Sequence, residues 1–189
     1  MKAFFCFFAV VLPTLLLAQK PCEFAINVTD SLGTYKETNQ YLVYERNFAG
    51  KSSYNYLSIA LVDNMPVLKM QIIARSKDFL AANCFDKNSK IYLQLDNGKI
   101  VTLIHVDQLV CATSVRNDQG YNNRILTGTF MFLSNSLTEL LNSPVSTMRV
   151  KFTTSSEDYI FSSVLKSELD GEKYDPQRYF IETLRCLSN

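Results

Sequence analysis

The chain has 189 residues, 47% of them hydrophobic, and it carries 19 Lys and Arg against 18 Asp and Glu. A nearly neutral chain lacks the clustered cations that neutralise phosphates, so its composition argues against a nucleic-acid partner. The apolar content excludes a disordered chain, and roughly 170 residues are enough to bury one sizeable core.

Residues 1–18 have the pattern of a secretory signal peptide. Lys2 supplies the positive charge, an apolar stretch follows, and Ala18 is the small residue before the expected cleavage at Gln19. The stretch is shorter than the roughly 20 residues of a spanning helix, and Pro13 interrupts it. We expect an exported protein, periplasmic, cell-surface or extracellular, with no membrane span after cleavage.

Cleavage leaves one expected β-rich domain, residues 19–189, which has 171 residues. Because Lys2 is the only charged residue removed, the mature domain carries 18 cations and 18 anions, a net charge of zero. Neutrality and the single histidine also argue against electrostatic capture and most metal chemistry. We expect no cofactor.

Four cysteines remain after cleavage, and they are Cys22, Cys84, Cys111 and Cys186. An even number in an exported chain indicates disulfides, because the compartment is oxidising. Four cysteines allow three pairings, and their spacing does not choose among them. Separations of tens of residues disfavour a zinc site, which usually has close cysteine pairs; four free buried thiols are the third alternative.

Residues 90–105 carry the clearest strand signal. Asn97-Gly98 separates two apolar runs, and this pair is a strong hairpin signal because both residues tolerate positive φ. A two-residue loop predicts a register in which Leu95 faces Ile100. The core face would then carry Ile91, Leu93, Leu95, Ile100, Thr102 and Ile104. The opposite face would carry Tyr92, Gln94, Val101, Leu103 and His105.

Other β-branched and aromatic runs predict six more strands, at 40–47, 54–61, 67–74, 125–133, 147–153 and 158–164. We expect the last two to form a second hairpin and the polar stretch 107–124 to be an exposed loop. The predicted fold is mainly β: an antiparallel β-sandwich or twisted sheet with one short helix and a C-terminal helix.

The short helix is expected to begin with a capping box. Ser136 would be the N-cap and Glu139, three residues later, would bind back to it. The helix should end at residues 142–144, where Pro144 cannot continue it.

The C-terminal helix is expected at about 176–187. Asp175 is a good N-cap residue, and Pro176 suits the first helical position. Tyr174 and Tyr179 could form a hydrophobic staple across this start. The apolar face consists of Phe180, Leu184 and Leu187, which repeat at helical spacing and should pack on the sheet.

Candidate catalytic chemistry is sparse. His105 is the single histidine, so a Ser-His-Asp triad would depend on it, and we expect it to be structural or exposed. The densest acidic spots are Glu157-Asp158 and Asp170-Gly171-Glu172, and paired carboxylates there would suit a hydrolase. Acidic residues in such turn-like segments usually just face water, so we expect no catalytic residue.

Tyrosines are concentrated in two neighbouring predicted strands. Tyr41, Tyr44, Tyr54 and Tyr56 would pack across the strands, as aromatic residues in sheets usually do. The functional alternative is an exposed patch for a ligand or partner.

The stretch 84–99, together with Met148-Arg149-Val150 and the ending 180–187, resembles a set of small, uncharacterised exported proteins of Gram-negative bacteria. Shared features are a lysine-x-serine-lysine run before a hairpin, a cysteine after it, a short capped helix and a terminal helix ending in Cys-Leu. The resemblance implies no activity. It implies that Cys111 pairs with Cys186, which leaves Cys22 with Cys84.

The resulting functional expectation is an exported, non-catalytic binding or structural module whose ligand is unknown. Its partner would be an envelope or extracellular protein. Two alternatives stay open: a hydrolase that uses carboxylates, and an inhibitor or chaperone-like protein that adds a strand at an exposed sheet edge.

Overall fold

A computed structural model describes residues 23–31, 33–106 and 108–187, except for the side chain of Cys186. The expected signal peptide, its cleavage residues Ala18 and Gln19, and Cys22 lie outside the described residues. The chain is mainly β, with 57% strand and 11% helix, and it contains a large antiparallel sheet and two short helices, one of them C-terminal. This confirms the predicted fold class.

The elements follow one another as strands, a short helix, more strands and a final helix. The strands are β1 Phe24–Asp30, β2 Gly33–Thr38, β3 Tyr41–Phe48, β4 Lys51–Val62, β5 Met65–Ser76, β6 Cys84–Phe85, β7 Lys90–Leu95, β8 Ile100–His105, β9 Val110–Cys111, β10 Thr113–Arg116, β11 Asn122–Phe132, β12 Val145–Lys151, β13 Ser156–Ile160, β14 Leu165–Lys166 and β15 Lys173–Tyr174. The helices are α1 Ser136–Asn142, the 3-10 turn η1 Pro176–Arg178 and α2 Tyr179–Leu187.

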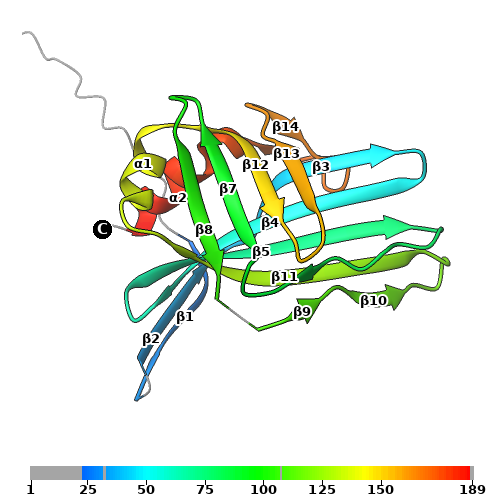
Figure 1. Cartoon of the computed structure of the whole chain (residues 1–189), viewed down its shortest axis with the longest axis horizontal. Helices are drawn as coiled ribbons and strands as arrows, with labels where there is room; N and C mark the ends of the chain where they lie inside the picture. The colour runs from blue at the N-terminus through cyan, green and yellow to red at the C-terminus, as the bar shows by residue number, and fades with distance from the viewer. Residues whose placement is uncertain (1–22, 32, 107, 188–189) are drawn as a thin grey trace, which may run out of the picture.

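Eleven strands form one antiparallel sheet. Its order is β1-β2-β4-β5-β11-β8-β7-β12-β13, with β3 added to β4 and β10 added to β11. The long strands allow this branching, because β2 and β3 pair with different parts of β4, and β8 and β10 with different parts of β11. Figure 1 shows β7, β8, β12 and β13 crossing the long strands steeply, with both helices opposite the tips of the long hairpins.

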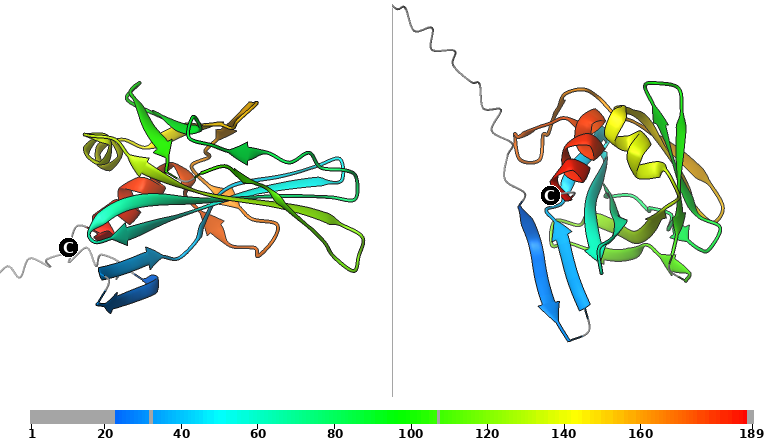
Figure 2. Two further views of the ribbon diagram at one scale, coloured as in Figure 1. Left: turned by 60° about the horizontal axis from the view of Figure 1, so that its bottom comes forward. Right: turned by 90° about the vertical axis from the view of Figure 1, so that its left-hand side faces the viewer.

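The sheet curls until two of its strands meet through side chains. Tyr44 of β3 and Tyr159 of β13 pack edge to face with their ring centroids 5.0 Å apart. The enclosed space holds one hydrophobic core, to which α2 adds Phe180 and Leu184. The β1–β2 hairpin projects away from this body in both views of Figure 2.

An aromatic cluster forms the centre of the core. Phe85 is fully buried and packs on Phe130, on Phe152 and on the His105 ring, with centroid distances of 5.2, 5.3 and 5.3 Å. Gly128 of β11 leaves the room that Phe85 needs, because a Cβ at that position would lie 2.7 Å from a Phe85 ring carbon. Any larger residue there would overpack the core.

The predicted register of the first hairpin is wrong by one residue. Leu95 pairs with Lys99 rather than Ile100, so the loop has three residues, and Gly98 takes the left-handed conformation with φ 82°. A three-residue loop of this kind is a type I turn followed by a glycine bulge. A shift of one residue reverses the faces of β8. Val101, Leu103 and His105 therefore point into the core, and Ile100 is 65% exposed.

The predicted capping box is also absent. Ser136 is the first residue of α1 and is buried, and the N-cap is Asn135, whose side chain makes no cap hydrogen bond. Glu139 binds the Lys99 ammonium instead, at 2.8 Å. The Glu139 carboxylate thus forms an ion pair with a residue of the neighbouring hairpin instead of capping its own helix. The end of the helix at Asn142 agrees with the prediction.

The start of the C-terminal helix confirms the sequence pattern. The Asp175 side chain accepts a hydrogen bond from the Arg178 amide, and Pro176 opens the first turn, which is 3-10 rather than α. Tyr41 inserts between Tyr174 and Tyr179, with centroid distances of 5.1 and 5.2 Å. A three-ring contact therefore takes the place of the predicted two-residue staple.

The stretch 107–124 is not a simple loop. It contains β9 and β10, and β10 pairs with β11 from Thr113 opposite Ile125 to Arg116 opposite Asn122. The exposed side chains of β10 show no alternation that would have indicated a strand. Its pairing depends on the free edge that the long strand β11 offers. The predicted second hairpin, by contrast, is present as β12 and β13.

Candidate functional site

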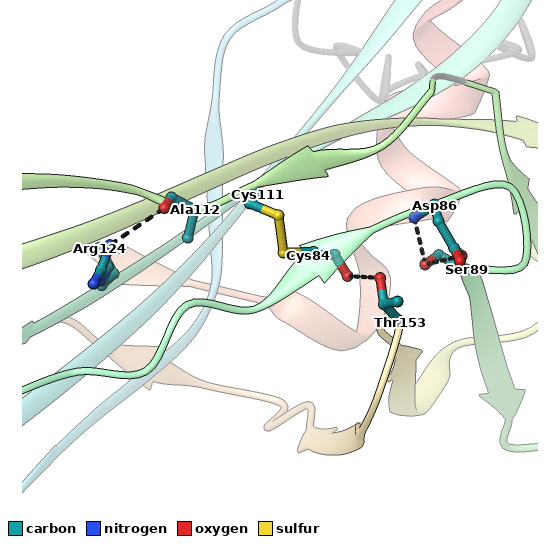
Figure 3. Close-up of a disulfide and its surroundings, with 7 residues drawn as sticks. All are labelled: Cys84, Asp86, Ser89, Cys111, Ala112, Arg124 and Thr153. Carbon is teal, nitrogen blue, oxygen red and sulfur yellow. Dashed lines mark hydrogen bonds between the residues drawn. A yellow bond between two sulfur atoms is a disulfide. The ribbon is translucent and has the colours of Figure 1, made fainter.

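The structure contains a disulfide between Cys84 and Cys111. The two residues lie opposite each other in the β6–β9 pair, and the Cys84 carbonyl accepts hydrogen bonds from the amide and the hydroxyl of Thr153 (Figure 3). The pairing that the resemblance implied, Cys111 with Cys186 and Cys22 with Cys84, is therefore wrong. Strand pairing across a long connection decides the bridge, and spacing along the chain does not encode it.

His105 is a buried residue of the core. Its ring packs between Phe85 and Phe130, and Nδ1 lies 3.2 Å from the Asp86 carbonyl oxygen. Asp86 in turn holds Ser89 in a tight turn beside the disulfide (Figure 3). These contacts agree with the expected structural role of the histidine.

Three of the four acidic residues singled out by the sequence have side-chain partners: Glu157, Asp158 and Asp170. Asp158 forms a two-pronged ion pair with Arg149, at 2.6 and 2.7 Å, which lowers the pKa of that carboxyl. The Glu157 carboxylate accepts the Tyr159 hydroxyl at 2.6 Å. Asp170 accepts a hydrogen bond from the Tyr174 hydroxyl at 2.7 Å, which lowers the pKa of Asp170. No group of three or more His, Cys, Asp and Glu within the described residues is placed to hold a metal ion.

The four tyrosines of β3 and β4 do not form one patch. Tyr41 packs on α2, and Tyr44 packs on Tyr159. The Tyr54 hydroxyl donates to Asn47 at 3.3 Å, while Tyr56 lines a hollow on the outer face of the sheet. The bulge between Leu42 and Tyr44 changes which residues of β3 face inward, and this divides the cluster.

This hollow is the best-formed candidate site. It has a volume of about 460 Å³ and lies on the face of β4, β5 and β11 opposite the core, with residues 108–110 as one wall. Seven of its thirteen lining residues carry a hydroxyl or an amide group, and Met70, Leu109 and Val110 add apolar surface. The polar lining residues are Glu37, Gln40, Tyr56, Ser58, Lys69, Gln71, Gln108, Thr127 and Thr129. Volumes of about 300–1,000 Å³ are usual for small-molecule sites.

The strand register brings these groups together. Ser58 of β4 lies opposite Lys69 of β5, which lies opposite Thr129 of β11. Tyr56 and Gln71 form the next such row with Thr127. Side chains alternate between the two faces of each strand, so the residues between these two polar rows point into the core. The polar residues therefore lie together on the outer face.

A connected set of hydrogen bonds forms one end of the hollow. The buried carboxylate of Glu37 accepts from Lys69 at 2.9 Å, from Ser58 at 2.8 Å and from the Tyr35 hydroxyl. Burial alone would raise the pKa of Glu37. The hydrogen bonds outweigh this effect of burial, and the bond from the Tyr35 hydroxyl contributes most. The pKa of Glu37 therefore lies below its usual value.

Lys69 shows the complementary shift. Burial alone would lower the pKa of its ammonium, but hydrogen bonds to Glu37 and Tyr35 outweigh this and raise it. Ser58, which faces a carboxylate, is only 2% exposed, so its hydroxyl is no nucleophile open to substrate. The pair supplies a fixed, internally neutralised polar wall, which suits binding rather than proton transfer.

Apart from Tyr56, the sequence did not single out these polar residues, because they come from four strands and two connections and form no local motif. Among the described residues, no helix is both long and apolar enough to cross a membrane. Comparison with protein-family models, with curated proteins and with solved structures found no match to this chain.

Proposed function

We propose that this protein is an exported, non-catalytic binding module whose hollow on β4, β5 and β11 holds an uncharged, hydroxyl-rich molecule of about disaccharide size. The observation that carries the proposal is the lining of the 460 Å³ hollow, in which amides and hydroxyls surround one internally neutralised ion pair. The Cys84–Cys111 bridge supports the export part, since disulfides persist in oxidising compartments.

The ligand class follows from the hydrogen-bonding groups. Gln40, Gln71 and Gln108 each offer a donor and an acceptor, as sugar hydroxyls require of a partner. Tyr56 adds a ring that can pack on the apolar face of a sugar. A charged ligand fits less well, because Lys69, the cation in the lining, already forms an ion pair with Glu37.

Amide NMR titration of the mature chain with maltose and with di-N-acetylchitobiose tests this proposal. We expect shifts at Ser58, Lys69 and Thr129, which border the hollow. Gln71→Ala should weaken binding by about threefold to tenfold, the effect of one lost hydrogen bond. Gln94→Ala is the matched control, because Gln94 is an exposed glutamine of β7 away from the hollow. Absence of shifts with both sugars, or equal loss in both variants, would contradict the proposal.

A second candidate function is strand addition at β1. This strand lies at the end of the sheet order, six of its seven residues are exposed, and its hairpin projects from the body (Figure 2). Ile26 and Val28 are 42% and 49% exposed. An uncovered edge with apolar side chains is what an added strand needs.

A peptide with the sequence of residues 23–31 serves as the incoming strand for a test. Hydrogen exchange of the β1 amides should slow when it is added, and Val28→Lys should remove this protection, because a charge on an edge strand opposes pairing. Val164→Lys, which changes an exposed valine after β13, should leave the protection intact. Unchanged exchange in β1 at millimolar peptide would argue against strand addition.

A further inference from the structure

A second hollow lies on the same face of the sheet, at the tips of the long hairpins. It has a volume of about 380 Å³ and is formed where the β3–β4 turn approaches the end of β5 and the β10–β11 turn, at the right of Figure 1. Its lining contains two cations, two aromatic rings and no carboxylate. The lining residues are Asn47, Phe48, Ala49, Gly50, Lys51, Ser52, Arg75 and Tyr121.

Arg75 is the central group. Its guanidinium lies 4.1 Å from the centroid of the Tyr121 ring, and the Lys77 ammonium lies 5.2 Å from the same centroid. Two cations on one ring repel each other, and an anion between or beside them would relieve that repulsion. Within the described ranges, no carboxylate forms an ion pair with Arg75, Lys77 or Lys51.

The hydrogen-bonding capacity of Arg75 is largely unused. A guanidinium has five N–H donors, and its one hydrogen bond to the described protein is a long one, 3.4 Å, to Gln119. The Nε atom is buried and has no hydrogen-bond partner among the described residues. A buried donor of this kind is costly unless something accepts from it.

The geometry is held in place before any ligand arrives. Tyr121 is fixed by its amide, which donates to the Asn117 side chain at 2.9 Å, and by its carbonyl, which accepts from the Asn117 amide at 2.9 Å. On the other side, Ser52 lies opposite Arg75 in the β4–β5 register, and both residues line the hollow. The site therefore rests on strands and a hydrogen-bonded turn.

We propose that this second hollow binds an oxyanion, a carboxylate or a phosphate group, with Arg75 as its main ligand and Lys51 and Lys77 adding positive potential. The planar fork of arginine matches two oxygens of either group, and a stacked ring orients the fork. The proposal does not depend on the first hollow, which has a different lining and whose nearest lining residue on β5, Gln71, lies four positions from Arg75, roughly 13 Å along the strand.

NMR titration of the mature chain with sodium phosphate and with sodium acetate, at ionic strength held constant with sodium chloride, tests the inference. We expect saturable shifts of the Arg75 Nε–H signal and of the amides of Gly50, Ser52 and Tyr121. Tighter binding of phosphate would identify a phosphate-type ligand, and tighter binding of acetate a carboxylate. Shifts no larger than those caused by chloride would overturn the inference.

Variants separate this site from general surface charge. Arg75→Gln should weaken oxyanion binding at least about tenfold, because it removes a charge-assisted pair of hydrogen bonds. Arg46→Gln removes a nearby cation that packs on Phe48 and does not line the hollow, so it should leave binding unchanged. Tyr121→Leu keeps the charge and should weaken binding less. Equal loss in the Arg46 and Arg75 variants would contradict the assignment.

Discussion

Replacing Phe85 with alanine should lower the free energy of unfolding by about 3–5 kcal/mol, the range for a buried phenylalanine. Phe85 is fully buried, and its ring contacts those of His105, Phe130 and Phe152. The cavity that it leaves is bounded by strands from both halves of the curled sheet. Their side chains cannot move in to fill it without breaking hydrogen bonds between paired strands. The measurement is urea unfolding followed by circular dichroism.

Phe79→Ala is the control for this prediction. Phe79 is 81% exposed, so its truncation should change the free energy of unfolding by less than about 0.5 kcal/mol. Similar losses in the two variants would show that Phe85 is not the centre of the core. A loss below about 1 kcal/mol for Phe85→Ala alone would lead to the same conclusion.

Removing the Cys84–Cys111 bridge should be nearly as damaging. The two cysteines are separated by 27 positions, and closing a loop of this length stabilises the fold by about 3–4 kcal/mol on the chain-entropy account. The double variant Cys84→Ala and Cys111→Ala should lose this amount in urea unfolding. Its β6–β9 pair is held additionally by Thr153 and by the Ala112 amide, so the fold should survive.

Mass spectrometry of a non-reduced digest tests the bridge directly. It should contain a peptide pair linked through Cys84 and Cys111, and the pair should disappear after reduction. A peptide linked through Cys111 and Cys186 would contradict the structure. An unfolding free energy unchanged in the double alanine variant would contradict the predicted contribution to stability.

The fold class followed from local chemistry. Alternating β-branched and aromatic residues predict the long strands of β3 to β13 within a few residues of their observed bounds, and Asp175-Pro176 predicts the observed start of the last helix. These features depend on neighbours in the chain. A side chain that caps its own helix, or a proline that fixes its own φ, acts in the same way in most tertiary contexts.

Tertiary contacts overruled the local pattern at two positions. Glu139 was predicted to cap its helix and instead binds Lys99, which the neighbouring hairpin brings within 2.8 Å. Asn97-Gly98 predicts a two-residue loop, but the Leu95 amide donates to the Lys99 carbonyl, so the loop has three residues. Within that loop the Asn97 amide donates a hydrogen bond to the Ser143 hydroxyl at 3.2 Å. In each case a residue roughly forty positions away offered a partner that the sequence pattern could not indicate.

Short-range conformational preferences are enough to show from the amino-acid sequence that this chain is mainly β, where most of its strands lie and how its last helix begins. The Cys84–Cys111 pairing, the inward orientation of His105 and the two hollows depend on contacts between distant segments of the chain. The overall charge was near neutral in the sequence, yet Arg75 and Lys77 lie on one ring of Tyr121 with no carboxylate paired to them among the described residues. A sum of charges carries no position. Arg75 and Lys77 are two residues apart in the chain, and the pairing of β5 with β11 brings Tyr121 beside them.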